Sequence, residues 1–208
     1  MWGRRFRLPF LSSNMLRQEK LRSSYQPFPV NLLFVGESPP ASGRFFYQRD
    51  SGLYRAMRDV FQVADEDFLT AFQSSGCYLI DLCPEPVDRL APQLRREICR
   101  ANETRLANAI ATLQPARIAT LLRSIEDNVN QAAELGGWQG PLIHLPYPGR
   151  WSKHRKVFEE ALEPIIRSLR QPRPSRHPGA AGTSIGPTSA TMPIEPAARP
   201  KGPKNRKL

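Results

Sequence analysis

The stretch of residues 30–47, VNLLFVGESPPASGRFFY, constrains the fold of this chain more than any other. The run from Leu32 to Val35 is apolar without interruption, which is typical of a strand buried on both faces of a mostly parallel sheet. A turn begins directly afterwards at Gly36. Ligands bind just beyond the carboxyl ends of strands in open α/β sheets, so Glu37 stands where such folds keep their chemistry.

The turn itself is stiffened by two successive prolines, Pro39 and Pro40. Each proline fixes its own φ and disfavours helix at the residue before it, which holds Ser38 extended and presents Glu37 on a rigid loop. Three aromatic residues follow close enough to form one wall of the same cleft. They are Phe45, Phe46 and Tyr47.

The rest of the body alternates between apolar runs and amphipathic segments. Further strands are predicted over residues 77–82, 117–122 and 141–145. Helices are predicted over residues 51–61, about 65–73, about 94–113, 124–135 and 152–170, with Ser51, Ser124 and Ser152 as capping residues. Strands that alternate with helices indicate an α/β fold, a three-layer sandwich with a central four-stranded parallel sheet.

Charge divides the chain into three parts. Residues 1–29 form a basic extension with a net charge of +5, and residues 171–208 form a Pro-rich basic tail with a net charge of +6. Residues 30–170, the predicted domain, hold seventeen charges of each sign. A neutral body with basic ends suits a protein that meets a polyanion, although basic tails also serve solubility. We expect residues 171–208 to be disordered, because Pro, Gly, Ala, Ser and Thr dominate them.

The cellular setting is predicted from what the chain lacks. It has no run of about 18 apolar residues, so we expect no membrane span. It has three cysteines, an odd number without a secretory signal, which favours reduced thiols and a cytoplasmic protein. We expect a monomer.

Several motifs occur in the order found in one known family. The turn Gly36-Glu37-Ser38-Pro39-Pro40 is followed by Tyr78-Leu79-Ile80-Asp81, Leu82-Cys83-Pro84-Glu85-Pro86, Asp88-Arg89, Glu97-Ile98-Cys99 and Leu113-Gln114-Pro115. Over residues 30–170 this order resembles the uracil-DNA glycosylase superfamily, and most closely its branch with a Gly-Glu-Ala-Pro-Gly turn and an iron-sulfur cluster. The resemblance implies that family's fold and the excision of uracil or another deaminated base from DNA.

Three departures from the family pattern bear on activity. The cluster of that branch needs four cysteines, and residues 1–76 contain none, so we expect no metal and no cofactor. Asp81 stands where the family reads its base with Asn, and an ionised Asp offers only acceptors. The family's His-Pro-Ser motif is replaced here by His144-Leu145-Pro146, so His144 either holds that role slightly displaced or is structural.

The chemistry of base excision then assigns roles to residues. Glu37 is predicted to stabilise the cationic sugar and His144, or a loop N–H, to stabilise the departing base. The base is expected to contact Ser38, Phe45, Phe46 and Asp81. DNA is expected to contact Tyr147, Arg150, Trp151 and Lys153.

Two other functions compete with this one. The first is a binding protein with a glycosylase-like fold and no catalysis, which the altered histidine motif favours. The second is a nucleotide hydrolase on an unrelated sheet, which the lack of a Gly-x-x-x-x-Gly-Lys loop argues against.

Overall fold

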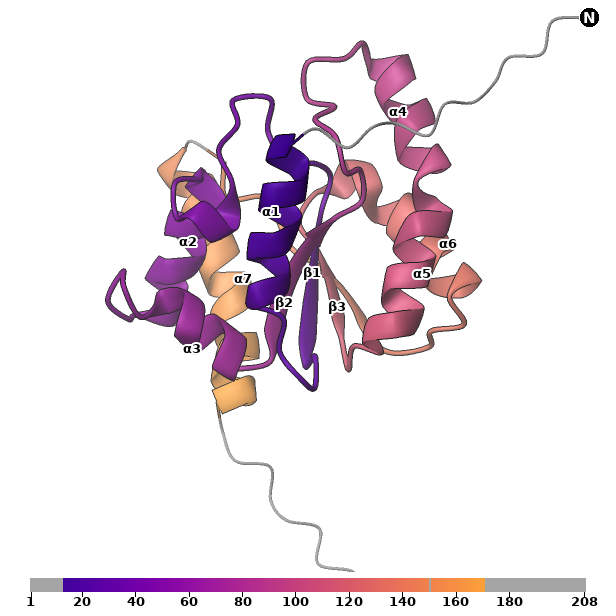
Figure 1. Cartoon of the computed structure of the whole chain (residues 1–208). Helices are drawn as coiled ribbons and strands as arrows, with labels where there is room; N and C mark the ends of the chain where they lie inside the picture. Colours follow the sequence, from indigo (N-terminus) through magenta and orange to yellow (C-terminus); the bar gives the residue numbers. More distant parts are fainter. Residues whose placement is uncertain (1–12, 150, 171–208) are drawn as a thin grey trace, which may run out of the picture. The chain divides into compact units, whose positions relative to one another are not determined.

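A four-stranded, all-parallel sheet forms the centre of the molecule (Figure 1). The computed structural model describes residues 13–149 and 151–170. The strands are β1 (Leu32–Gly36), β2 (Cys77–Asp81), β3 (Ile118–Thr120) and β4 (Leu142–His144). They lie in the order β2-β1-β3-β4. The chain therefore leaves β1 toward one edge of the sheet and later returns to extend the sheet toward the other, which creates a topological switch point between β1 and β3.

Helices cover both faces of the sheet, so the predicted α/β three-layer sandwich is confirmed (Figure 1). On one side lie α2 (Gly52–Phe61), α3 (Phe68–Ser74) and α7 (Ser152–Arg170). On the other lie α4 (Pro92–Ala101), α5 (Glu103–Leu113) and α6 (Glu126–Leu135). Helix α1 (Ser13–Ser24) precedes the sheet, and two short 3-10 turns complete the list, η1 (Phe46–Gln48) and η2 (Arg123–Ile125).

Helix α2 forms as the sequence predicts. The Ser51 side chain accepts a hydrogen bond from the backbone N–H of Tyr54 and caps the first turn. Tyr54, Met57 and Phe61 recur at helical spacing and are fully buried. The helix ends at Gln62, which adopts a left-handed conformation with φ of 52°.

Packed aromatic rings join η1, α2 and α3 into one layer. The Phe46 ring lies 5.0 Å from the Tyr47 ring and 5.3 Å from the Phe72 ring, between centroids. Phe68 stands 5.0 Å from Tyr54 in an edge-to-face arrangement. Such geometry adds about 0.5–1.5 kcal/mol per pair beyond the area buried, so the segment that follows the first turn is anchored firmly in the core.

Helix α1 lies in the segment that we expected to be only a basic extension. Its Arg22 is buried and donates a hydrogen bond to the carboxylate of Asp81 at the end of β2, over 3.2 Å. The Tyr25 ring, just after the helix, stacks on the Tyr47 ring with centroids 5.6 Å apart. The folded unit therefore begins before residue 30.

One predicted helix is in fact two. Residues 94–113 were expected to be continuous, but α4 and α5 meet at Asn102. The Asn102 amide donates to the carbonyl of Ile98 over 2.9 Å. An asparagine side chain competes in this way for backbone groups that would otherwise continue a helix.

The two other predicted capping residues, Ser124 and Ser152, do not directly precede their helices. Ser124 does not cap α6, because it lies inside η2 and α6 begins at Glu126 without a side-chain cap. Ser152 is the first residue of α7 and not the residue before it, since the carbonyl of Trp151 accepts from the N–H of Arg155 at the helix start. The helix continues through Pro164. The predicted basic tail, residues 171–208, lies outside the described residues.

Among the described residues, no helix combines the length and the apolar character needed to cross a membrane.

Candidate functional site

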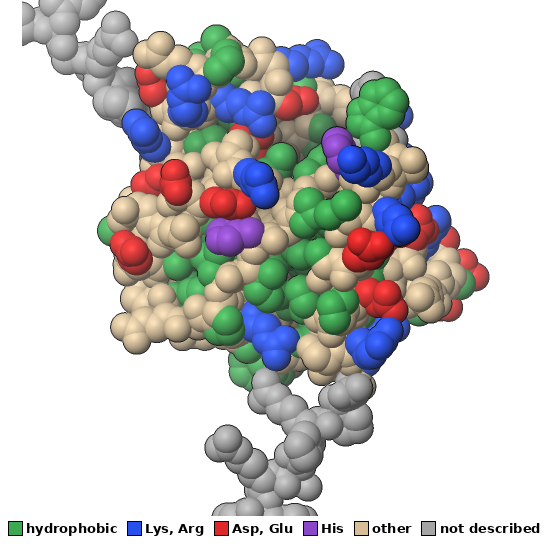
Figure 2. Space-filling view, turned by 180° about the vertical axis from the view of Figure 1, so that it is seen from behind, with side chains coloured by type: hydrophobic (Ala, Val, Ile, Leu, Met, Phe, Trp, Pro, Cys, Tyr) green, Lys and Arg blue, Asp and Glu red, His purple; other side chains and the backbone are tan. Residues whose placement is uncertain are grey.

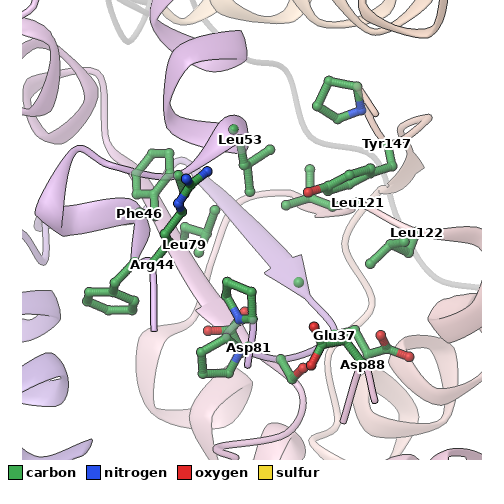
Figure 3. Close-up of a pocket in the computed structure, with 18 of the residues that line it drawn as sticks. Glu37, Arg44, Phe46, Leu53, Leu79, Asp81, Asp88, Leu121, Leu122 and Tyr147 are labelled. Carbon is green, nitrogen blue, oxygen red and sulfur yellow. The ribbon is translucent and has the colours of Figure 1, made fainter. Parts of the chain in front are cut away.

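A cavity of about 640 Å³ opens at the carboxyl ends of the strands (Figure 3). Every strand contributes to its lining: β1 through Gly36 and the turn after it, β2 through Asp81, β3 through Leu121 and Leu122, and β4 through the loop that holds Tyr147. The cavity thus lies at the switch point, where open α/β sheets bind their ligands.

The carboxylate of Glu37 lies in the lining and is only 6% exposed. Arg95, from the first half of α4, donates from Nε to Oε1 over 2.6 Å and from Nη2 to Oε2. Both carboxylate oxygens are therefore engaged by one planar guanidinium, the strongest and most directional pairing that an arginine makes. The backbone carbonyl of Glu37 also accepts from the N–H of Cys83, which ties the turn to the segment after β2.

Asp81 lies beside this turn, because β1 and β2 pair in register with Gly36 opposite Asp81. A Cβ on Gly36 would come within 2.6 Å of the Asp81 Oδ1, so any other residue there would force the Asp81 carboxylate to move. Burial raises the pKa of Asp81, while the positive charges of Arg22 and Arg105 oppose that rise. Arg105 binds the backbone here, donating to the carbonyls of Asp81 and Leu82.

The two phenylalanines predicted to stack a base line the cavity, but both belong mainly to the core. Phe45 is 2% exposed and Phe46 is 4% exposed. Arg22 lies over the Phe45 ring, 5.5 Å from its centroid. Leu53 and Leu79 complete this apolar wall, and Figure 3 shows it facing Leu121, Leu122 and Tyr147 across the cavity.

Ser38 also lines the cavity, and its hydroxyl accepts a hydrogen bond from the N–H of Val87 over 3.2 Å. Asp88 nearby accepts from the N–H of Ala41. These two bonds hold the turn after β1 against the segment after β2. Ser38 is thus a brace for the Glu37 turn as well as part of the wall.

His144 is not brought to this cavity. It ends β4, its side chain is 42% exposed, and it is not among the residues of the lining. Its Nδ1 lies 2.9 Å from the Thr120 hydroxyl and 3.5 Å from the Glu126 carboxylate. The structure therefore gives His144 a partner on β3 and a partner on α6, and separates it from Glu37.

The residues predicted to touch DNA are divided between the cavity and the surface. Tyr147 is 45% exposed and lines the cavity together with Pro148 and Gly149. Trp151 is 74% exposed at the start of α7, and Lys153 is exposed on the first turn of that helix. Arg150 lies outside the described residues.

Arginines are the residues that the sequence analysis missed. Arg22, Arg95 and Arg105 hold the carboxyl groups and the backbone at the strand ends, as described above. Three more line the cavity, namely Arg44, Arg55 and Arg155. Only Arg155 has a signal in the sequence, since it belongs to the basic run Lys153-His154-Arg155, which indicates a phosphate-facing turn or a solvated face. Nothing pointed to the other arginines, because thirty Lys and Arg residues are spread along the chain and only tertiary contacts distinguish these.

The cysteines do not fit an iron-sulfur cluster. Cys83 and Cys99 approach within 3.8 Å, between sulfur atoms, but Cys77 lies at the opposite end of β2. All three are buried free thiols, as expected for small apolar core residues. Two neighbouring thiols cannot replace the four ligands that such a cluster needs.

The chain matches no protein-family model and no curated protein.

The face opposite to the view of Figure 1 is shown in Figure 2. Apolar side chains form a band down its middle, and Lys, Arg, Asp and Glu side chains stand along both sides of the band.

Proposed function

We propose that this protein is a DNA glycosylase that hydrolyses the N-glycosidic bond of uracil or another deaminated base. The observation that carries the proposal is that Glu37 and Asp81, from paired strand ends, line one cavity with apolar walls. Its volume, about 640 Å³, suits a small ligand such as a nucleoside extruded from DNA.

The chemistry asks for a negative charge near the sugar. As the bond from C1′ to the base nitrogen breaks, its electron pair leaves with the base, and positive charge builds on the sugar. Water then adds its oxygen to C1′, and the proton that it releases ends on the departing base. Glu37 would stabilise the cationic sugar, and Arg95 would fix the plane of its carboxylate.

The departing base carries the electron pair and needs a donor. His144 stands outside the lining, so that role falls to N–H groups of the turn after β1. When ionised, Asp81 offers only acceptors, which suit the ring N–H of a deaminated base and disfavour its carbonyl oxygens. Base preference is therefore tested with uracil, hypoxanthine and xanthine, which arrange their ring N–H and carbonyl groups differently.

A second function is binding without catalysis. It is favoured by one specific observation, the engagement of both Glu37 oxygens by Arg95. A carboxylate held in such a pair is partly neutralised and has less charge to offer a cationic sugar. In this case the cavity recognises an extruded or modified base and leaves it attached.

The test is the substitution Glu37→Gln, which keeps size and one acceptor but removes the charge. Purified protein is incubated with single- and double-stranded oligonucleotides that carry uracil, hypoxanthine or xanthine, and abasic sites are cleaved with alkali. We expect excision to fall by about 10²- to 10³-fold, with DNA affinity retained. Glu134→Gln, at an exposed carboxylate on α6 away from the cavity, is the matched control.

The outcomes separate the two functions. Hydrolysis is supported if the parental protein excises a base and the Glu37→Gln variant does not. Binding of the same oligonucleotides without excision by either protein supports recognition alone. Excision at the parental rate by Glu37→Gln removes Glu37 from the mechanism.

We also propose the oligomeric state and the cellular compartment in which the protein acts. The protein acts on DNA as a monomer in the cytoplasm, where reducing conditions keep the three buried cysteines as thiols.

A further inference from the structure

The lining of the cavity holds more arginines than carboxyl groups. Four arginines and three carboxyl groups line the cavity. Arg95 is paired with Glu37, which leaves Arg44, Arg55 and Arg155. Within residues 13–149 and 151–170, no ion pair involves any of these three, and the side chains of Arg44 and Arg155 make no hydrogen bond.

The acidic groups of the lining are already engaged with other partners. Glu37 is held by Arg95, and Asp81 is held by Arg22. Asp88 accepts the backbone N–H of Ala41. Asp88 is then the only carboxylate of the lining without a cation partner among the described residues, so the three arginines leave an excess of positive charge in the cavity.

These arginines come from separate parts of the fold. Arg44 precedes the aromatic wall, Arg55 is in the first turns of α2, and Arg155 is on α7, which packs against α2. Figure 3 shows Arg44 beside Phe46 and Leu53, on the opposite side of the cavity from Leu122 and Tyr147. A single cavity thus combines an apolar wall with three guanidinium groups that form no ion pair among the described residues, of which that of Arg55 donates to the backbone carbonyl of Asp50.

We propose that Arg44, Arg55 and Arg155 bind a phosphate group of the nucleotide whose base lies against the apolar wall. Guanidinium groups match phosphate geometry and are the favoured cations for binding it. The inference rests on the proposed nucleic-acid substrate but not on hydrolysis. It names the substrate class as a nucleotide with its phosphate, because a free base or nucleoside leaves the three arginines unpaired.

The experiment compares two triple variants of the full chain with equal loss of charge. The cavity variant carries Arg44→Ala, Arg55→Ala and Arg155→Ala. The control variant carries Arg17→Ala, Arg96→Ala and Arg100→Ala, which remove exposed arginines of α1 and α4 outside the cavity lining. Binding of a labelled 11-nucleotide single strand with one central 2′-deoxyuridine is followed by fluorescence anisotropy, and melting temperatures verify folding.

We expect the cavity variant to lose at least tenfold more affinity than the control variant, since hydrogen bonds to charged groups are lost. Competition with dUMP and with 2′-deoxyuridine identifies the source of the phosphate. If dUMP competes for the parental protein but not for the cavity variant, the site binds a terminal phosphate. If dUMP does not compete for the parental protein, the site binds a phosphodiester within the strand. Equal losses in the two triple variants overturn the proposal.

The failure of hydrolysis and the failure of this inference are distinguishable. If the parental protein excises no base, and binding falls in the cavity variant but not in the control variant, the phosphate site is supported and the glycosylase is rejected. Excision that proceeds with equal efficiency in both triple variants rejects the phosphate site and keeps the glycosylase.

Discussion

Arg22 on α1 and Asp81 at the end of β2 form a buried ion pair, with Nη2 and Oδ2 3.2 Å apart, although 59 positions separate them in the sequence. The pair joins the amino-terminal helix to the strand end that lines the cavity. The Nε of Arg22 is buried without a hydrogen-bond partner among the described residues. The ion-pair partner of Asp81 is therefore an incompletely satisfied guanidinium of α1, and Arg105 adds a second positive charge nearby.

Removal of that guanidinium is expected to destabilise the fold. Arg22→Met keeps the length of the side chain but leaves Asp81 buried without its cation, at a cost of about 3 kcal/mol. For a domain of this size that corresponds to a fall of about 6–12 °C in melting temperature. Arg17→Met, at an exposed position of the same helix, is the control and should melt like the parent. Equal melting temperatures for the two variants would contradict the role of the pair.

The stability of the protein should depend on pH through Asp81. Burial raises the pKa of this carboxyl above its ordinary value of 3.8, so the folded state binds its proton more tightly than the unfolded state. The parent therefore loses stability as pH rises through that raised pKa, whereas Asp81→Asn has no proton to lose. We expect the parental melting temperature minus that of Asp81→Asn to fall between pH 4 and pH 7. A difference that stays constant or grows over this range would show that the carboxyl group is not buried as described.

Substitution of Arg95 tests the role of its paired hydrogen bonds to the Glu37 carboxylate. Arg95→Gln leaves the buried Glu37 carboxylate without its cation, so the melting temperature should fall, and by less than for Arg22→Met because the Arg95 side chain is already 34% exposed. If Arg95 positions a catalytic carboxylate, kcat should fall with KM nearly unchanged, and Arg95→Lys should restore part of the rate. An unchanged kcat in correctly folded Arg95→Gln would show that the pair of Arg95 and Glu37 is purely structural.

The thiols should be unreactive in the folded protein. Burial raises the pKa of Cys77 and of Cys83 to about 12, and burial also raises the pKa of Cys99. A thiol with so high a pKa has only about 10⁻⁴ of its population as thiolate at pH 8, and the thiolate is the reactive form. We expect dithionitrobenzoate to modify no thiol within minutes at pH 8 and all three in guanidinium chloride. Rapid modification of one thiol in the native protein would place it at the surface.

The basic tail should contribute to DNA binding. Residues 171–208 carry a net charge of +6 and no aromatic residue, so their removal should weaken DNA binding and flatten its dependence on salt. The melting temperature should be nearly unchanged. A full-length variant with its basic tail residues replaced by Gln separates charge from length. A salt dependence that is the same with and without the tail would reject its contact with phosphates.

The sequence by itself determined the parallel α/β fold and the position of its turn. Leu32 to Val35 are apolar on both faces, which is typical of an interior strand of such a sheet, and all four are buried. Ser51 and the apolar spacing after it determined α2 in the same local way, since a cap and a periodicity act over a few residues. Glu37 at the strand end followed from the same local pattern.

The tertiary structure alone decided what surrounds Glu37. Strand order, the pairing of Arg95 with Glu37 and of Arg22 with Asp81, and the separation of His144 from the cavity all depend on residues distant in the chain. The sequence around a charged side chain is the same kind of sequence whether the side chain lies on a solvated face or in a buried ion pair. Only the packing of the helices on the sheet decides which arginine reaches which carboxylate, and therefore which charges remain free to meet a ligand.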